Sequence, residues 1–482
     1  MRIALAAAEA TPFAKTGGLG DAVAGLTRCL GRAGHDARLF LPFYGSIDTY
    51  GRGFVPVEYA QDVALAMGPH RYTFSLWTAP LPGGGPAVYF VHCPPLFDRP
   101  SIYTGRADEP LRFGLLTRAV LESCQRMGFA PDVLHAHDWH TALLPVYLRT
   151  HYRWDGLFAG AGTLLTIHNI GYQGVFAGQA IEELDLGPHR GLLPAEDVAA
   201  GRVNFLRAGI VHADLLSTVS PRHAQEIQTA EYGSGLEGLL RGRAGSLTGI
   251  LNGVDDDWSP ATDVHLPANY SRHDLAGKRV CKRALVEGLG LPFREDIPVA
   301  GVVSRLTKQK GIDLFIDALP ALLASRDLQL VAVGSGEERY ETFFARLERD
   351  FPRQVVAYRG YSNHLAHRVE AGADLFLMPS LYEPCGLNQM YSLRYGTPPV
   401  VRATGGLADS VEPWDWVTQG GTGFVFEDYT ADGLAWAVDS AVATFRHPDS
   451  WRRLQDNGMA EDFSWEVQGE KYVELYRRAA AA

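Results

Sequence analysis

The chain has 482 residues, 46% of them hydrophobic, which predicts about two to four domains with cores of their own. Lys and Arg number 44 against 55 Asp and Glu, and the net charge of −11 argues against nucleic acid as the main partner. The five cysteines are scattered without a C-x-x-C pair, so we expect neither a disulfide framework nor a zinc site, and a cytoplasmic location.

The first predicted element is a strand in the apolar run at residues 3–8. Glu9 interrupts this run and a glycine loop follows it, so a signal peptide is not expected. No apolar segment of the chain reaches the roughly 18 to 20 residues of a membrane span, and we expect no membrane partner.

The loop "ATPFAKTGGLGDAV", residues 10–23, joins this strand to a predicted helix. It is not a P-loop, because Lys15 precedes the glycines, and it lacks the G-x-G-x-x-G spacing of a dinucleotide site. Backbone N–H groups and Lys15 could bind an anion there. The glycines could equally serve only the geometry of the turn, and the loop alone leaves both interpretations open.

Further strands are predicted in the first half at residues 37–41, 133–135, 163–167 and 215–219, with an inserted antiparallel meander at about 53–92. "HAHDWHTAL" (135–143) and "TIHNIGYQG" (166–174) place polar side chains at two strand ends. The H-x-H-D-x-H spacing is a weak metal pattern, and these residues suit a substrate with many hydroxyl groups better.

A second series of strands is predicted at 299–303, 328–333, 355–358, 375–378 and 399–401, after a division near residues 245–258. Alternating strands and helices indicate parallel α/β layers. "TGGLGD" at 16–21 has a faint echo in "TGGLAD" at 404–409, which suits two similar α/β domains.

Two loops of the second half carry candidate functional residues. Arg305, Lys308 and Lys310 follow one strand, where an open α/β sheet binds phosphorylated ligands, although a solvated basic turn is the alternative. Glu383 follows another strand and is either a catalytic carboxylate or a charge at a helix N-terminus. Cys385 has no matching base, so we interpret it as a packing residue or backbone donor rather than a nucleophile.

Together "KTGGLGD", "HAHDWH", "TIHNIGYQG", "LNGVD", "SRLTKQKG" and "EPCGLNQMYSLRYGTPPVVRATGGLAD" closely resemble bacterial glycogen synthases and plant starch synthases from about residue 2 to about residue 476. The resemblance implies a GT-B-type α/β fold, with two Rossmann-like domains facing across a deep cleft. The expected domains are 1–247 on the acceptor side and 248–458 for the nucleotide sugar. A C-terminal helix within 459–482 is expected to return to the first domain.

The implied activity is retaining transfer of glucose from ADP-glucose to the 4-hydroxyl of a glycogen or maltooligosaccharide end, with no cofactor and no metal. The family's catalytic positions fall on Lys15, His168, Arg305, Lys310 and Glu383. Its donor- and sugar-binding positions fall on Gly18, Asp21, Asp138, Asn169, Asn252, Tyr361, Cys385, Gly386 and Leu387, with Tyr361 expected beside the adenine. ADP rather than UDP rests on the resemblance alone, because Tyr361 could stack on either base.

The chain departs from the family at two positions, where Leu381 replaces a common Arg and Asn388 a common Thr. Other retaining enzymes of this architecture carry a second acid where this chain has Tyr391, which weakens assignment to sucrose- or trehalose-type transferases. Two further alternatives are a glucan phosphorylase and a regulatory glucan-binding protein. A glucan phosphorylase needs a longer chain and a cofactor lysine that we do not find, and a regulatory glucan-binding protein needs no cations to bind a leaving group.

Overall fold

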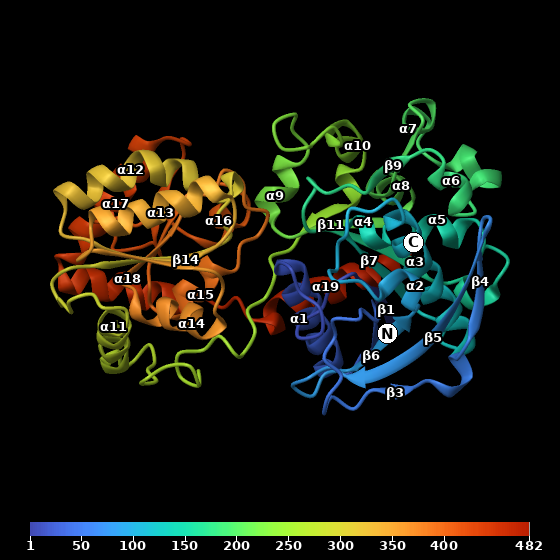
Figure 1. Cartoon of the computed structure of the whole chain (residues 1–482), viewed down its shortest axis with the longest axis horizontal. Helices are drawn as coiled ribbons and strands as arrows, with labels where there is room; N and C mark the ends of the chain where they lie inside the picture. The colour runs from blue at the N-terminus through green and yellow to red at the C-terminus, as the bar shows by residue number, and fades with distance from the viewer. Residues whose placement is uncertain (482) are drawn as a thin grey trace. The chain divides into compact units, whose positions relative to one another are not determined.

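The computed structural model describes residues 1–481, which form two compact units. Unit 1 is Met1–Gly253 together with the segment from Trp465 onward, and unit 2 is Val254–Ser464. The boundaries expected after residues 247 and 458 lie a few residues before those of the structure. Each unit contains a largely parallel sheet with helices on its faces, so the expected α/β fold class is confirmed (Figure 1). Among the described residues no helix has the length and apolar character needed to cross a bilayer.

The sheet of unit 1 has ten strands in the order β12-β11-β8-β7-β1-β2-β6-β5-β3, with β4 paired to β5. Its central strands are buried on both faces, which explains their continuous apolar sequences. The strands are β1 (Arg2–Ala6), β2 (Asp36–Pro42), β3 (Val55–Pro56), β4 (Val63–Met67), β5 (His70–Pro80), β6 (Ala87–His92), β7 (Val133–His137), β8 (Gly162–Ile167), β11 (Leu215–Thr218) and β12 (Leu247–Gly249). A separate pair, β9 (Val175–Ala177) and β10 (Arg202–Asn204), is antiparallel.

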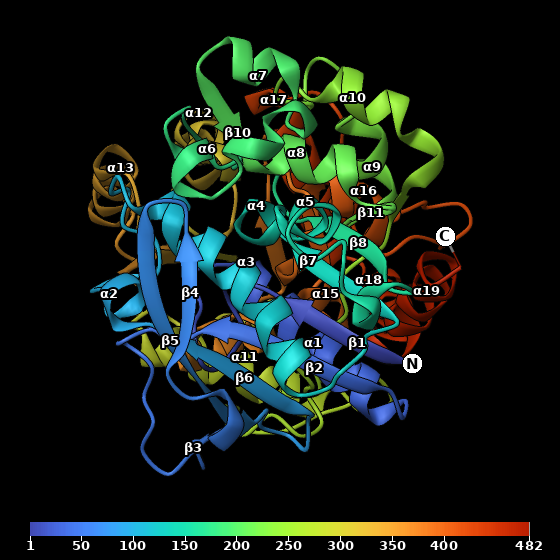
Figure 2. The ribbon, with the colours of Figure 1, turned by 90° about the vertical axis from the view of Figure 1, so that its right-hand side faces the viewer.

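The inserted meander differs from the expectation in its last strand. Strands β3, β4 and β5 are antiparallel as predicted, but β6 also runs parallel to β2, with Leu39 opposite Val88 (Figure 2). The sequence "AVYFVH" is apolar at nearly every position because β6 lies between β2 and β5 inside the sheet. The insertion therefore extends the parallel sheet instead of forming a separate layer.

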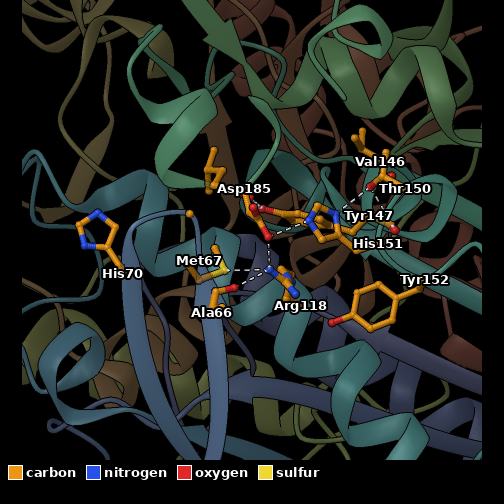
Figure 3. A network of polar contacts seen from close by, with 12 residues as sticks. Ala66, Met67, His70, Arg118, Val146, Tyr147, Thr150, His151, Tyr152 and Asp185 are labelled. Atoms are coloured by element: carbon orange, nitrogen blue, oxygen red, sulfur yellow. Dashed lines mark hydrogen bonds and ion pairs between the residues drawn. The ribbon is translucent and has the colours of Figure 1, made fainter. Parts of the chain in front are cut away.

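Arg118 of helix α3 (Glu109–Arg126) anchors this meander to the rest of unit 1 (Figure 3). Its guanidinium donates to the carbonyl oxygen of Ala66 on β4 at 2.6 Å and to Asp185 Oδ2 at 3.4 Å. The same Asp185 oxygen lies 3.0 Å from His151 Nε2. The buried arginine thus joins the insertion to the loop that carries Asp185 and, through Asp185, to His151.

The C-terminal helix α19 (Trp465–Ala479) packs within unit 1 against helix α1 (Gly18–Arg32). The Trp465 indole occupies the space beside Gly25, where a Cβ atom would lie 1.9 Å from the ring nitrogen. The Cys29 thiol lies 3.1 Å from the Trp465 carbonyl oxygen. The other helices of unit 1 are α2 (Pro94–Phe97), α4 (Asp138–Thr141), α5 (Leu144–Arg149), α6 (Ala180–Glu183), α7 (Ala195–Ala199), α8 (Phe205–His212), α9 (Pro221–Glu226) and α10 (Glu237–Gly242).

Unit 2 has a six-stranded parallel sheet in the order β15-β14-β13-β16-β17-β18. Figure 1 shows α12 and α13 on one face of this sheet and α14 and α15 on the other. The strands are β13 (Val299–Val303), β14 (Gln329–Gly334), β15 (Val355–Arg359), β16 (Leu375–Met378), β17 (Pro399–Arg402) and β18 (Phe424–Phe426). The helices are α11 (Ala276–Gly288), α12 (Ile312–Ser325), α13 (Glu338–Asp350), α14 (Asn363–Gly372), α15 (Asn388–Arg394), α16 (Gly405–Ser410), α17 (Ala431–Phe445) and α18 (Pro448–Ala460).

Candidate functional site

Glu9, which follows β1 and is buried, binds the glycine loop of unit 1. Its Oε2 accepts the N–H of Thr16 at 2.6 Å and that of Gly17 at 3.3 Å, and its Oε1 accepts the Thr16 hydroxyl at 2.7 Å. The Tyr103 hydroxyl donates to the same Oε1. One buried carboxylate thus binds four donors and fixes the loop just before α1 begins.

Lys15 belongs to this loop, and its side chain is partly exposed. Its ammonium is 2.7 Å from Asp21 Oδ2 and 2.8 Å from Asp21 Oδ1, and Asp21 also accepts the Thr11 hydroxyl at 2.8 Å. Asp21 sits in the first turn of α1, where a carboxylate is favoured by the helix dipole. Lys15 and Asp21 are therefore positioned together, with the cation toward solvent.

The three glycines of the loop are not required by backbone conformation. None of Gly17, Gly18 and Gly20 has a positive φ, and Gly17 is extended at −157°. A Cβ atom on Gly17 would meet nothing within 4 Å. The space beside Gly17 is open, which favours close approach of a ligand over the purely geometric explanation of the glycines.

Asp138 and His168 come together at the ends of neighbouring strands β7 and β8. Asp138 begins α4 with φ 53°, and its Oδ1 accepts the N–H of His168 at 2.7 Å and that of Asn169 at 3.4 Å. Burial raises the pKa of Asp138 to about 7, although these two N–H groups oppose the rise. Asp138 therefore fixes the backbone of the 168–169 turn, and Asn169 Oδ1 accepts from the Gly171 N–H at 3.0 Å.

The histidines around this turn form a buried hydrogen-bonded network. His168 Nε2 lies 3.0 Å from His137 Nδ1, and His135 lies 2.9 Å from the Tyr476 hydroxyl and 2.6 Å from Thr166 Oγ1. Burial lowers the pKa of His168 to about 3, so its ring is neutral at pH 7. Within residues 1–481, the one group of side chains close enough to hold a metal lies in unit 2, not here.

In unit 2 two strand-end loops meet because of Gly311. Its φ is 75°, and a Cβ atom there would lie 1.9 Å from the Pro379 carbonyl oxygen, so only glycine allows this approach. The Leu381 N–H donates to the Gln309 carbonyl oxygen at 2.9 Å. As a result Lys310 Nζ lies 2.6 Å from Glu383 Oε2, and Ser380 Oγ donates to the same oxygen at 3.0 Å.

The loop after Glu383 rests on the glycine pair of α16. A Cβ atom on Gly405 would lie 1.9 Å from the Glu383 carbonyl oxygen, and one on Gly406 would lie 2.0 Å from that of Cys385. The Gly406 N–H donates to the Glu383 carbonyl at 3.0 Å. The glycines of "TGGLAD" therefore support the Glu383 loop by close packing, whereas Gly17 of "TGGLGD" borders open space.

The remaining predicted site residues are divided between the two units. Arg305 is exposed after β13, and Tyr361 is 65% exposed with its hydroxyl 3.0 Å from Asn363 Oδ1. Gly386 has φ 70°, and it lies with buried Cys385 and with Leu387 directly before α15. Asn252 is buried in unit 1, after β12.

The positions at which the chain departs from the family it resembles have identifiable contacts. Leu381 acts through its backbone, since its carbonyl oxygen accepts from Arg402 at 2.6 Å. Asn388 Nδ2 donates to the Val303 carbonyl oxygen at 3.1 Å, which ties α15 to the end of β13. The ring of Tyr391 stacks on Trp258 at 4.0 Å between centroids, so an aromatic side chain packs where other enzymes carry an acid.

Sequence reasoning missed Glu9, Tyr103 and Ser380 as site residues. A signal for Glu9 was present, because an acid directly after a buried apolar strand needs hydrogen-bond donors. Tyr103 gave no such signal, since only the fold brings it to Glu9, whereas Ser380 stands three residues before Glu383 in the sequence.

The chain matches two family models. The "Starch synthase catalytic domain" model matches residues 2–242, and the "Glycosyl transferases group 1" model matches residues 290–455. "Glycogen synthase 1" of Geobacter sulfurreducens is 46% identical over 486 residues, covering 99% of this chain and 96% of that protein. "Glycogen synthase" of Anaeromyxobacter dehalogenans is 48% identical over 487 residues, covering 100% and 99%.

Solved structures agree with this family. The catalytic domain of starch synthase IV from Arabidopsis thaliana, bound to ADP and acarbose, superposes with a TM-score of 0.92 at 35% identity, covering 100% of this chain and 99% of that chain. A sucrose-phosphate synthase from Thermosynechococcus elongatus reaches 0.62 at 18% identity, with coverage of 100% and 99%, and shares the fold. The resemblance found in the sequence is therefore confirmed: the chain is a glycosyltransferase and belongs to the family of glycogen and starch synthases.

Proposed function

We propose that the protein transfers glucose from ADP-glucose to the non-reducing 4-hydroxyl of an α-1,4-glucan, with retention of anomeric configuration. The observation that carries the proposal is the pair of Lys310 and Glu383, 2.6 Å apart at neighbouring strand ends of unit 2 in a chain of this family. The structure of the relative from Arabidopsis contains ADP and acarbose, which supports a nucleoside diphosphate and a glucan as ligands here.

In the proposed reaction the bond between the anomeric carbon and the phosphate oxygen breaks, and its electron pair leaves with ADP. The acceptor 4-hydroxyl forms the new bond on the same face, and its proton passes to the departing phosphate oxygen. Negative charge grows on that oxygen, so fixed cations stabilise the transition state more than the ground state. Arg305 and Lys310 are the fixed cations that stabilise this oxygen. We propose that Lys15 also contacts the donor.

We assign Glu383 an orienting and electrostatic role toward the donor sugar. Lys310 and Ser380 hold one of its oxygens, and its other oxygen is left to accept sugar hydroxyls. A glycosidase-type double displacement needs a second carboxylate about 5 Å away, and the position of a second acid in related enzymes is Tyr391 here. Front-face attack is consistent with that difference.

His168 is suited to bind a sugar hydroxyl while neutral. Its lowered pKa keeps positive charge away from an anomeric carbon that itself becomes positive in the transition state. Tyr361 offers an exposed ring on which a base can stack. The arrangement proposed for transfer needs no metal, because cationic side chains neutralise the diphosphate.

The proposal is tested by two measurements on one preparation: the melting temperature with and without ADP, and ADP release from ADP-glucose in the presence of glycogen. Stabilisation by ADP together with turnover supports the proposal. Stabilisation without turnover would instead favour a regulatory nucleotide- or glucan-binding protein.

A further inference from the structure

Three histidines and an aspartate lie close together in unit 2, and none of them is among the residues proposed to act in glucose transfer. His364 and His367 lie in the first turns of α14, and Asp263 and His265 lie in the segment before α11. Ligand atoms of Asp263, His265 and His367 all lie within 4.8 Å of one another. His364 lies beside this group of three, with its Nδ1 3.4 Å from Nδ1 of His265.

The separation of the two imidazole nitrogens matches that of two ligands on one metal. Zinc–nitrogen bonds of about 2.0–2.1 Å at a tetrahedral angle place two ligand nitrogens about 3.4 Å apart. As a hydrogen bond, the same 3.4 Å between His265 and His364 is long. The distance between the two ring nitrogens therefore fits two ligands of one metal ion at least as well as it fits a hydrogen bond between the rings.

The buried half of the cluster is already oriented. Asp263 Oδ2 lies 2.8 Å from His367 Nδ1 and accepts the Tyr395 hydroxyl at 2.6 Å, while Asp263 Oδ1 accepts the His265 N–H at 2.8 Å. These contacts fix the Asp263 carboxylate beside the His367 ring and the backbone of His265. Trp258 stacks on the His367 ring at 3.7 Å between centroids and closes that side.

The charge of the cluster also suits a cation. The carboxylates of Asp263 and Asp257 both lie close enough to act on the His367 ring. Imidazole nitrogens beside a carboxylate are the ligand set that zinc and its neighbours in the first transition row prefer.

We propose that Asp263, His265 and His367, with His364 beside them, form a binding site for a divalent transition-metal ion, with Zn²⁺ as the best-fitting ion. The ion joins the segment before α11 to the first turns of α14 and so stabilises unit 2. It takes no part in glucose transfer, and the site stands whether or not the proposed donor is correct.

The test uses the untagged full chain freed of metal with EDTA. Co²⁺ replaces Zn²⁺ as the probe, because a tetrahedral site with nitrogen ligands gives it a visible absorption band much stronger than that of the hydrated ion. We expect the band in the wild type, its displacement by Zn²⁺, and a higher melting temperature with Zn²⁺. We expect His364→Ala to weaken Zn²⁺ binding on the order of 10- to 100-fold, and His265→Ala/His364→Ala to abolish the band.

His364 and the control residue His273 are both exposed, so neither variant should disturb folding, which the metal-free melting temperature checks. His273→Ala should bind like the wild type. The proposal is overturned if the wild type shows neither the band nor a Zn²⁺-dependent melting shift. It is equally overturned if both persist in His265→Ala/His364→Ala, because Zn²⁺ then binds elsewhere.

Discussion

The ammonium nitrogen of Lys310 lies 2.6 Å from Oε2 of Glu383, although the two residues follow different strands, β13 and β16. Both side chains are mostly shielded, with 19% of Lys310 and 6% of Glu383 exposed. Removing one member leaves the other with an unpaired charge in a partly buried place, which is costly. Each residue of the pair therefore depends on the other to compensate its charge.

We expect Glu383→Gln to lower kcat of glucose transfer on the order of 10²- to 10³-fold while ADP binding is retained. The amide keeps the size of the side chain but loses the charge that pairs with Lys310. Transfer assays and calorimetric ADP titration measure the two effects separately. Glu287→Gln, on the exposed surface of α11, is the matched control. Near-normal kcat in Glu383→Gln would remove Glu383 from the mechanism.

We expect Glu9→Gln to destabilise the glycine loop, because an amide nitrogen cannot accept from the N–H groups and hydroxyls that Glu9 binds. The cost should be about 1–3 kcal/mol in the free energy of unfolding, measured with urea. Donor KM should rise more than kcat falls if the loop binds the donor. Tyr103→Phe removes a single donor from the same carboxylate and should give a smaller effect in the same direction.

Gly17→Ala and Gly406→Ala should distinguish the role of Gly17 in "TGGLGD" from that of Gly406 in "TGGLAD". A methyl group at Gly17 meets nothing within 4 Å, so stability should change by less than about 1 kcal/mol while transfer activity falls. A methyl group at Gly406 would lie 2.0 Å from the Cys385 carbonyl oxygen, so stability should fall by about 1–3 kcal/mol. Unchanged transfer by Gly17→Ala would return that glycine to a purely geometric role.

Asp138 should make stability depend on pH below neutrality. Its pKa rises from 3.8 to about 7 on folding, so between these values the folded state holds a proton that the unfolded state has lost. This contribution to stability is fully present below about pH 4 and is lost as the pH rises to about 7.

Asp138→Asn can still accept both N–H groups but cannot titrate. The difference in unfolding free energy between variant and wild type should therefore change by on the order of 1–4 kcal/mol between pH 4 and pH 8. Urea denaturation at several pH values measures it. A difference that does not vary with pH would show that the Asp138 carboxyl titrates normally.

Much of the fold could be predicted because buried parallel strands are apolar along their whole length, as in β13 and β16. The antiparallel pairing of β6 with β5 was predicted, but its parallel pairing with β2 was not, because a single sequence does not say which strand pairs with its second edge. Lys310 and Glu383 could each be placed at a strand end, but their contact depends on the tight packing of Gly311 against Pro379. The cluster around His265 and His364 gave no signal, since its members lie about 100 residues apart and meet only through tertiary structure.

The most direct test of the central claim is glucose transfer onto glycogen with ADP-glucose and UDP-glucose compared at equal concentration. The account predicts rapid transfer from ADP-glucose, a strong preference over UDP-glucose, and a product with new α-1,4 linkages. A preference for UDP-glucose would contradict the donor assignment, and no transfer from either donor would contradict the proposed function itself.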